Sequence, residues 1–263
     1  MPASPLRVDR RDDGVVVLTL DLPDRRNAMT AELTEAWVEA VTGLKGDRSA
    51  RCVVVTGAGS AFCAGGDVSW IGSEPDATAD RLRDRMAPFY RAWLSIRDLD
   101  VPTVAAINGP AVGAGLAMAM ACDLRYATDA AKMSVPFTSL GMHPGMATTW
   151  LLPQLVGLPA ARELFFTGRA VAGPEAVALG LVNRVFPAEG FLDEVLRIAA
   201  TIAATAPVAT RLTKVALANG GHAGFEAALE WESLAQPVTL ATQDLQEGLR
   251  ARAERRRPDF TGR

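Results

Sequence analysis

One stretch, residues 108–123, constrains the fold of this chain more than any other part of its sequence. It opens with a glycine-rich turn, Asn-Gly-Pro-Ala-Val-Gly-Ala-Gly, and continues as a run of small apolar residues without a polar stripe. A surface helix would show polar residues every three to four positions, so the run predicts a helix that is buried on all sides. The run is too short to cross a bilayer, which takes about 20 apolar residues.

The segment before this turn, residues 101–107, is short and rich in β-branched residues, as an interior strand would be. When a strand is followed by a glycine turn and then by a buried helix, the unpaired N–H groups of the first helical turn point at a pocket. Those groups suit a negatively charged oxygen where the side chains leave room, and Gly113, Ala114 and Gly115 leave that room. The alternative is that the small residues only allow close helix packing.

Composition excludes several classes of protein. Apolar residues make up 49% of the 263 residues and the net charge is −3, which is typical of a soluble globular protein and argues against a nucleic-acid partner. The N-terminus has no apolar leader and no run would span a membrane, so we expect a cytoplasmic protein without a membrane partner. Three cysteines and two histidines offer no zinc set, so we expect no metal and a reducing compartment.

The remaining pattern predicts an α/β core followed by a helical region. Strands at 15–20 and 51–56 flank a helix at 31–44, an amphipathic helix covers 78–99 after a loop at 70–77, and short strands are expected at 123–128 and 132–136. We expect the core to cover residues 1–203 and a helical region to cover 204–263, with faces suited to packing on another subunit. Further helices are predicted at 146–156, 162–167, 174–179, 191–204, 207–219, 224–234 and 239–257.

A second glycine-rich turn, residues 57–67, follows the buried strand at 51–56. Its Gly-x-Gly-x-x-Gly pattern fails at the last place, where Phe62 stands, so a dinucleotide site is not predicted. Ala64, Gly65 and Gly66 instead indicate a close approach of the backbone to a ligand, and Asp67 suits a helix cap.

The loop at 22–29 carries Arg25 and Arg26. The planar guanidinium group suits a phosphate, so either arginine is a candidate for phosphate binding. The alternative is that both side chains are simply solvated.

Taken together, these motifs resemble the enoyl-CoA hydratase/isomerase family, the crotonase superfamily, over nearly the whole chain. The resemblance implies a crotonase-like spiral of ββα units with a C-terminal helical region, and a homotrimer or a hexamer made of two trimers. It also implies an acyl-CoA thioester as the small-molecule substrate, with coenzyme A as part of that substrate and no permanently bound cofactor. The motifs that carry it, in chain order, are residues 26–29, 61–68, 108–115, 122–124, 136–141 and 257–263.

The family holds the thioester oxygen with two backbone N–H groups, and the matching positions are Gly66 and Ala114. With His143 as a candidate proton shuttle, these form the expected catalytic set. The resemblance implies that coenzyme A is bound around Arg25, Arg26, Ala28, Ala64, Gly65, Asp67, Val68, Gly113, Pro136 and Leu140.

The sequence departs from the family where hydration chemistry is carried out. Family hydratases use two glutamates, and Ala117 and Phe137 occupy those positions, so two-glutamate hydration is not expected. Family isomerases often place an acidic residue at a later turn, where Gly145 stands. His143 remains near the expected pocket, although it is alternatively a turn residue. Cys63 also remains there and suits a lining residue better than a nucleophile. The other groups near the pocket are the carboxylates Asp67, Glu74 and Asp76.

The sequence therefore predicts an acyl-CoA enzyme that stabilises a thioester enolate with the backbone N–H groups of Gly66 and Ala114. The proton carrier of the reaction is left unassigned. Two alternatives remain open: a catalytically inactive acyl-CoA-binding homologue, and a CoA-thioester hydrolase or decarboxylase on the same scaffold.

Overall fold

The computed structural model describes residues 4–219 and 224–263, and its centre is a mixed six-stranded sheet. The first strand runs antiparallel to the second, and the other neighbouring strands are parallel. In spatial order the strands are β1 (Leu6–Arg10), β2 (Val15–Leu20), β3 (Cys52–Gly57), β4 (Thr103–Ile107), β6 (Leu124–Thr128) and β8 (Arg184–Phe186).

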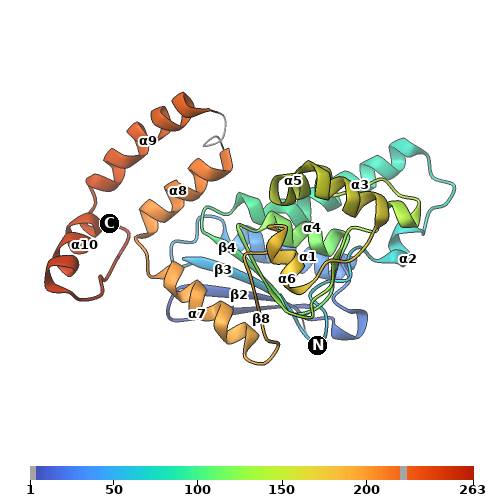
Figure 1. The fold of residues 1–263 in the computed structure, drawn as a ribbon, viewed down its shortest axis with the longest axis horizontal. Helices are drawn as coiled ribbons and strands as arrows, with labels where there is room; N and C mark the ends of the chain where they lie inside the picture. The colour runs from blue at the N-terminus through green and yellow to red at the C-terminus, as the bar shows by residue number, and fades with distance from the viewer. Residues whose placement is uncertain (1–3, 220–223) are drawn as a thin grey trace.

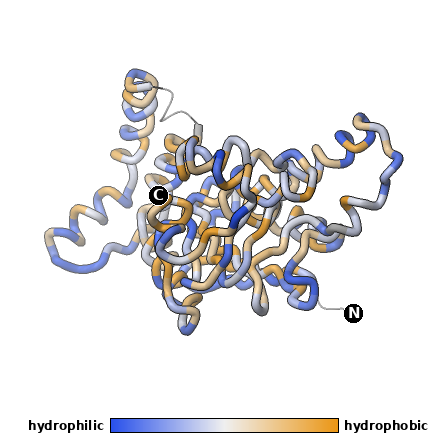
Figure 2. The backbone as a smooth tube through the Cα atoms, turned by 45° about the vertical axis from the view of Figure 1, so that its right-hand side comes forward, coloured by the Kyte–Doolittle hydropathy of each residue, from blue (hydrophilic) through white to orange (hydrophobic). Residues whose placement is uncertain are grey.

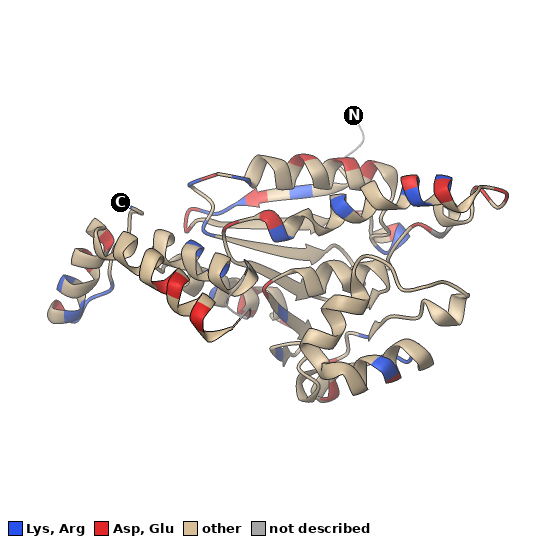
Figure 3. Ribbon diagram, turned by 90° about the horizontal axis from the view of Figure 1, so that it is seen from above, with Lys and Arg blue, Asp and Glu red and all other residues tan. Residues whose placement is uncertain are grey.

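Helices cover both faces of this sheet (Figure 1). Side chains alternate along β2, so Leu18 and Leu20 join the core formed with α1 (Ala31–Leu44), α3 (Ala79–Leu94) and α4 (Ala114–Ala121). Val15 and Val17 point the other way, into a second core that α7 (Phe191–Ala203) closes. The strands β2, β3 and β4 carry no charged residue, whereas many acidic and basic residues lie on the helices and loops around the sheet (Figure 3).

A second layer of short connections lies beside the main sheet. β5 (Ala111–Val112) pairs with β7 (Met133–Ser134), and single bridges join Cys63 to Ala111 and Met29 to Gly66. The remaining elements of the core are the 3-10 turns Pro23–Arg25, Ser95–Asp98 and Thr138–Leu140, and the helices α2 (Val68–Ile71), α5 (Thr148–Thr167) and α6 (Gly173–Ala178).

The C-terminal region consists of α8 (Pro207–Asn219), α9 (Phe225–Leu240) and α10 (Gln243–Glu254), which extend away from the body (Figure 1). Hydrophobic stretches occur on this arm as well as in the body (Figure 2). α7 ends at Ala203 and α8 begins at Pro207, but the division into units 1–203 and 204–263 stays a prediction.

The predicted α/β architecture is confirmed, and every residue of α4 is buried, as its composition requires. Several details differ. β1 was not predicted, and residues 70–71 belong to α2 rather than to a loop. The two helices expected at 146–156 and 162–167 run together as α5, with a non-helical residue at Gly157. The helix expected at 239–257 is divided between α9 and α10 because the Thr242 side chain accepts a hydrogen bond from the Leu245 N–H and starts a new helix.

Among the described residues, no single helix is long and apolar enough to cross a membrane. α7 and α8 meet such a criterion only when they are joined, and the chain bends by 105° between them.

Candidate active site

The two glycine-rich turns lie against each other. The Val112 N–H donates to the Cys63 carbonyl over 3.0 Å, which joins the turns side by side. A Cβ built on Gly65 would lie 2.7 Å from the Val112 carbonyl oxygen and 3.5 Å from the Ala114 nitrogen, and Gly65 has a φ of +97°. Only glycine suits a position with both a left-handed backbone and so close a neighbour.

The two N–H groups that the sequence singles out lie on these joined turns. Ala114 is the first residue of α4, and its N–H therefore has no acceptor within the helix. Gly66 lies in a bridge in which the Met29 N–H donates to the Gly65 carbonyl over 2.8 Å, so the bridge does not use the Gly66 N–H. Within the described part of the chain, the Gly66 N–H donates no hydrogen bond.

The buried Asn27 and the half-buried Asn108 hold the first of these turns in shape. The Asn27 side chain donates to the carbonyls of Ala58, Ala61 and Phe62 at 2.8–3.2 Å and accepts from the Leu22 N–H at 2.9 Å. Asn108 accepts from the Gly57 N–H at 3.1 Å and donates to the Gly59 carbonyl at 3.1 Å. These roles cannot be assigned from the sequence alone, because the partners of both asparagines are distant in sequence.

The arginine loop lies beside the same turn. The Arg25 guanidinium forms a 2.7 Å ion pair with Asp67, and the Arg26 carbonyl accepts from the Ala64 N–H at 2.9 Å. The Arg26 side chain is exposed, and Ala28 is half-buried. Asp67 also accepts from the backbone and hydroxyl of Ser69, which lowers the pKa of its carboxyl and caps α2.

The positions matched to the family's glutamates carry no acid. Ala117 is fully buried in α4. The Phe137 ring lies against the turn that precedes α4, because a Cβ on Gly113 would be 3.7 Å from its Cζ atom. Both positions are therefore apolar and cannot activate a water molecule.

The other predicted site residues are spread around this centre. His143 is exposed, and its Nδ1 atom lies 2.8 Å from the carbonyl oxygen of Pro144. Pro136 packs on Gly168, whose Cβ would lie 3.4 Å from the Pro136 Cα atom, and Leu140 is exposed. Val68 is the first residue of α2.

The remaining candidates have other partners or are inaccessible. Cys63 is fully buried, which raises the pKa of its thiol to about 12 and keeps it protonated. Glu74 forms ion pairs with Arg81 and Arg85 of α3, and Asp76 is exposed. No group of three or more His, Cys, Asp and Glu side chains in the described ranges could hold a metal ion.

Tyr90 of α3 is a further side chain that the sequence does not mark as a site residue. A Cβ built on Gly145 would lie 2.5 Å from its hydroxyl oxygen, so the hydroxyl fills the space where a side chain at position 145 would begin. Tyr90 is half-buried, which raises its pKa and keeps the hydroxyl protonated at neutral pH. The sequence identifies Tyr90 only as part of an amphipathic helix.

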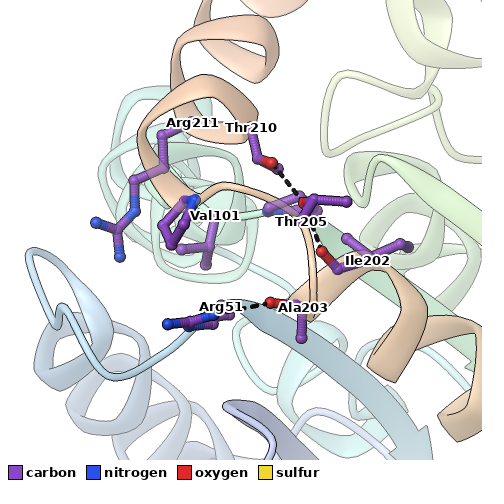
Figure 4. Close-up of a pocket in the computed structure, with 9 residues that line it drawn as sticks. Arg51, Val101, Ile202, Ala203, Thr205, Thr210 and Arg211 are labelled. Carbon is purple, nitrogen blue, oxygen red and sulfur yellow. Dashed lines mark hydrogen bonds between the residues drawn. The ribbon is translucent and has the colours of Figure 1, made fainter. Parts of the chain in front are cut away.

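A separate small pocket lies at the junction of α7 and α8 (Figure 4). Arg51 donates there to the carbonyls of Ala203 and Phe260, and Arg211 donates to the carbonyls of Asp47 and Ala50. These contacts anchor the C-terminal region to the core, and the pocket includes no residue of the two turns.

Known proteins resemble the chain over almost its whole length. The sequence profile of the enoyl-CoA hydratase/isomerase family matches residues 10–263. The crotonyl-CoA hydratase of Syntrophomonas wolfei is 33% identical over 251 residues, which cover 95% of each chain.

Solved structures give the same result. The enoyl-CoA hydratase of Bacillus anthracis is 33% identical and superposes with a TM-score of 0.92 over 98% of this chain and 100% of the other. The enoyl-CoA hydratase of Mycobacterium smegmatis is 30% identical, with a TM-score of 0.90 over 98% of this chain and 99% of the other. The protein therefore belongs to the enoyl-CoA hydratase/isomerase family and has the crotonase fold.

Proposed function

We propose that the protein is an acyl-CoA enzyme in which the N–H groups of Gly66 and Ala114 stabilise a thioester enolate. The observation that carries the proposal is the contact between the two glycine turns, which brings the backbone of Gly65 close to the Ala114 nitrogen. Membership of the family supports an acyl-CoA as the substrate.

The chemistry follows from where charge develops. Forming an enolate moves negative charge onto the thioester oxygen, and two fixed N–H donors stabilise that charge more than they stabilise the ground state. One such donor contributes about 3 kcal/mol in acyl-transfer enzymes, which is roughly a factor of 100 in rate. Ala114 keeps the donor because only the side chain differs from glycine.

The reaction does not follow the two-glutamate route of hydration in this proposal, because Ala117 and Phe137 supply no carboxylate. That absence also favours two other candidates: an acyl-CoA-binding protein without catalysis, and a hydrolase or decarboxylase acting on CoA thioesters.

A substrate panel separates these functions. Purified protein would be incubated with 2-butenoyl-CoA, 3-hexenoyl-CoA and methylmalonyl-CoA, while products, free CoA and carbon dioxide are measured. Turnover that is abolished in a folded Gly66→Pro variant, which lacks one N–H, supports the oxyanion role. Binding of all three without turnover identifies a non-catalytic protein, and unchanged turnover in Gly66→Pro contradicts the proposal.

We also propose that the C-terminal helices assemble the chain into a homotrimer, or a hexamer of two trimers. α9 has no buried residue within the chain and exposes Phe225 and Leu234, and Leu217 of α8 is exposed as well. Apolar surface of this extent is normally covered in a stable protein, and a second copy of the chain would cover it.

A further inference from the structure

We propose that the Tyr90 hydroxyl is the proton donor to the α-carbon of the enolate. The inference rests on the proposed function, because it needs the enolate that Gly66 and Ala114 would hold. It concerns a side chain that lies on α3, outside both glycine turns.

Contacts connect Tyr90 to the Gly66 turn on one side. A Cβ on Gly66 would lie 3.1 Å from the Cδ1 atom of Ile71 in α2. The neighbouring Trp70 packs on Phe89 of α3 with ring centroids 5.1 Å apart, and the Phe89 and Tyr90 centroids are 6.2 Å apart. The first wall of the site therefore runs from Gly66 through α2 to α3.

A second set of contacts connects Tyr90 to the Ala114 turn. The Phe137 ring lies against Gly113, the residue before Ala114. The Phe137 carbonyl accepts from the Met142 N–H at 2.9 Å, and the same segment continues to Gly145, against which the Tyr90 hydroxyl lies. The two sets of contacts start at the two glycine turns, and both reach Tyr90.

Tyr90 carries an acidic hydroxyl among these contacts, whereas His143 of the same segment is exposed and has its Nδ1 atom 2.8 Å from the Pro144 carbonyl oxygen. Ile71, Trp70, Phe89 and Phe137 carry no proton bound to oxygen, whereas Tyr90 does. Within the described part of the chain, the Tyr90 hydroxyl has no hydrogen-bond partner, so its proton is available to a ligand. Burial favours the protonated form, which suits a donor and not a base.

The step balances without a co-reactant. The electron pair of the enolate C=C bond takes the Tyr90 proton, a C–H bond forms at the α-carbon, and the thioester carbonyl is restored. The O–H electron pair stays on the phenolate oxygen, which regains a proton from water. Such a donor serves a reaction that forms the enolate without removing an α-proton, as the loss of carbon dioxide from a malonyl-type thioester does: the C–CO₂ bond breaks and its electron pair becomes the enolate.

The test is Tyr90→Phe assayed in D₂O with methylmalonyl-CoA. We expect kcat to fall about 100-fold, within the range of general acid catalysis, with little change in KM. Wild-type product should carry deuterium in one stereochemical position at the α-carbon, because one fixed donor delivers it. Residual product from Tyr90→Phe should carry deuterium in both positions, because water then supplies it from either face.

The chain offers a matched control in Tyr126→Phe. Tyr126 is its other tyrosine and lies in the core on the α7 side of the sheet, so the same change there should leave rate and label unchanged. Gly145→Ala provides an independent variant, because its methyl group would displace the Tyr90 hydroxyl. It should lower kcat in the wild-type background and have little further effect in Tyr90→Phe.

Tyr90→Phe that turns over at the wild-type rate, with deuterium in a single position, would overturn the inference and leave the oxyanion proposal intact. A wild-type protein that turns over no thioester would overturn the proposed function, and this inference with it.

Discussion

Asn27 is the buried polar residue on which the shape of the first glycine turn depends. Its side chain bonds to one N–H and three carbonyl groups, and it has a left-handed backbone with a φ of 55°. Asparagine tolerates this conformation better than alanine does. We expect Asn27→Ala to lower the free energy of unfolding by about 1–3 kcal/mol, because buried polar groups lose their partners.

Urea unfolding measures this loss. The exposed neighbour Arg26 provides the control, since Arg26→Ala should change the free energy of unfolding by less than about 0.5 kcal/mol. A similarly small change for Asn27→Ala would show that the turn holds its shape without the asparagine.

The two arginines of the loop should act differently on a ligand. Both arginine side chains are exposed, but Arg25 is paired with Asp67. We expect Arg26→Ala to weaken binding of an acyl-CoA more than binding of the corresponding acyl-pantetheine, which lacks the nucleotide phosphates. Calorimetric titration with both ligands measures the difference, and equal losses would exclude a phosphate contact for Arg26.

At the scale of the element, α9 is a helix that the rest of the same chain does not bury. Phe225 and Leu229 are 78% and 50% exposed and lie four residues apart, on one face of the helix. We expect Phe225→Asp with Leu229→Asp to convert an oligomer into single chains, as measured by light scattering. Ala227→Asp adds a charge to the opposite face and should leave the assembly intact; a wild-type protein that is already monomeric would contradict the proposal.

The elements divide into those that local sequence determines and those that it does not. α4 could be predicted because its residues are apolar at every position, which only a buried helix explains. β1 could not, because four of its five residues are exposed and its pairing depends on β2. The division between α9 and α10 was missed because the capping threonine lies inside an otherwise helical pattern.

The same distinction applies to the site at the scale of the whole molecule. The glycine turns could be found from the sequence, because small residues beside a strand indicate a close approach of the backbone. The position of Tyr90 could not, because it depends on how α3 packs over the segment that contains Gly145. The fold places the 63–66 turn against the start of α4, and α3 against the segment that contains Gly145, although these pieces are separated in sequence.

The central claim is that the Ala114 N–H stabilises charge on the substrate, and Ala114→Pro tests it most directly. Proline is favoured at the first position of a helix, so this change removes the N–H and preserves α4. Ala31→Pro makes the same change at the exposed first position of α1 and serves as the control. With any thioester that the wild-type protein turns over, we predict that kcat/KM falls about 100- to 1,000-fold in Ala114→Pro and is unchanged in Ala31→Pro, with both variants folded. A folded Ala114→Pro variant with wild-type kcat/KM would contradict the account.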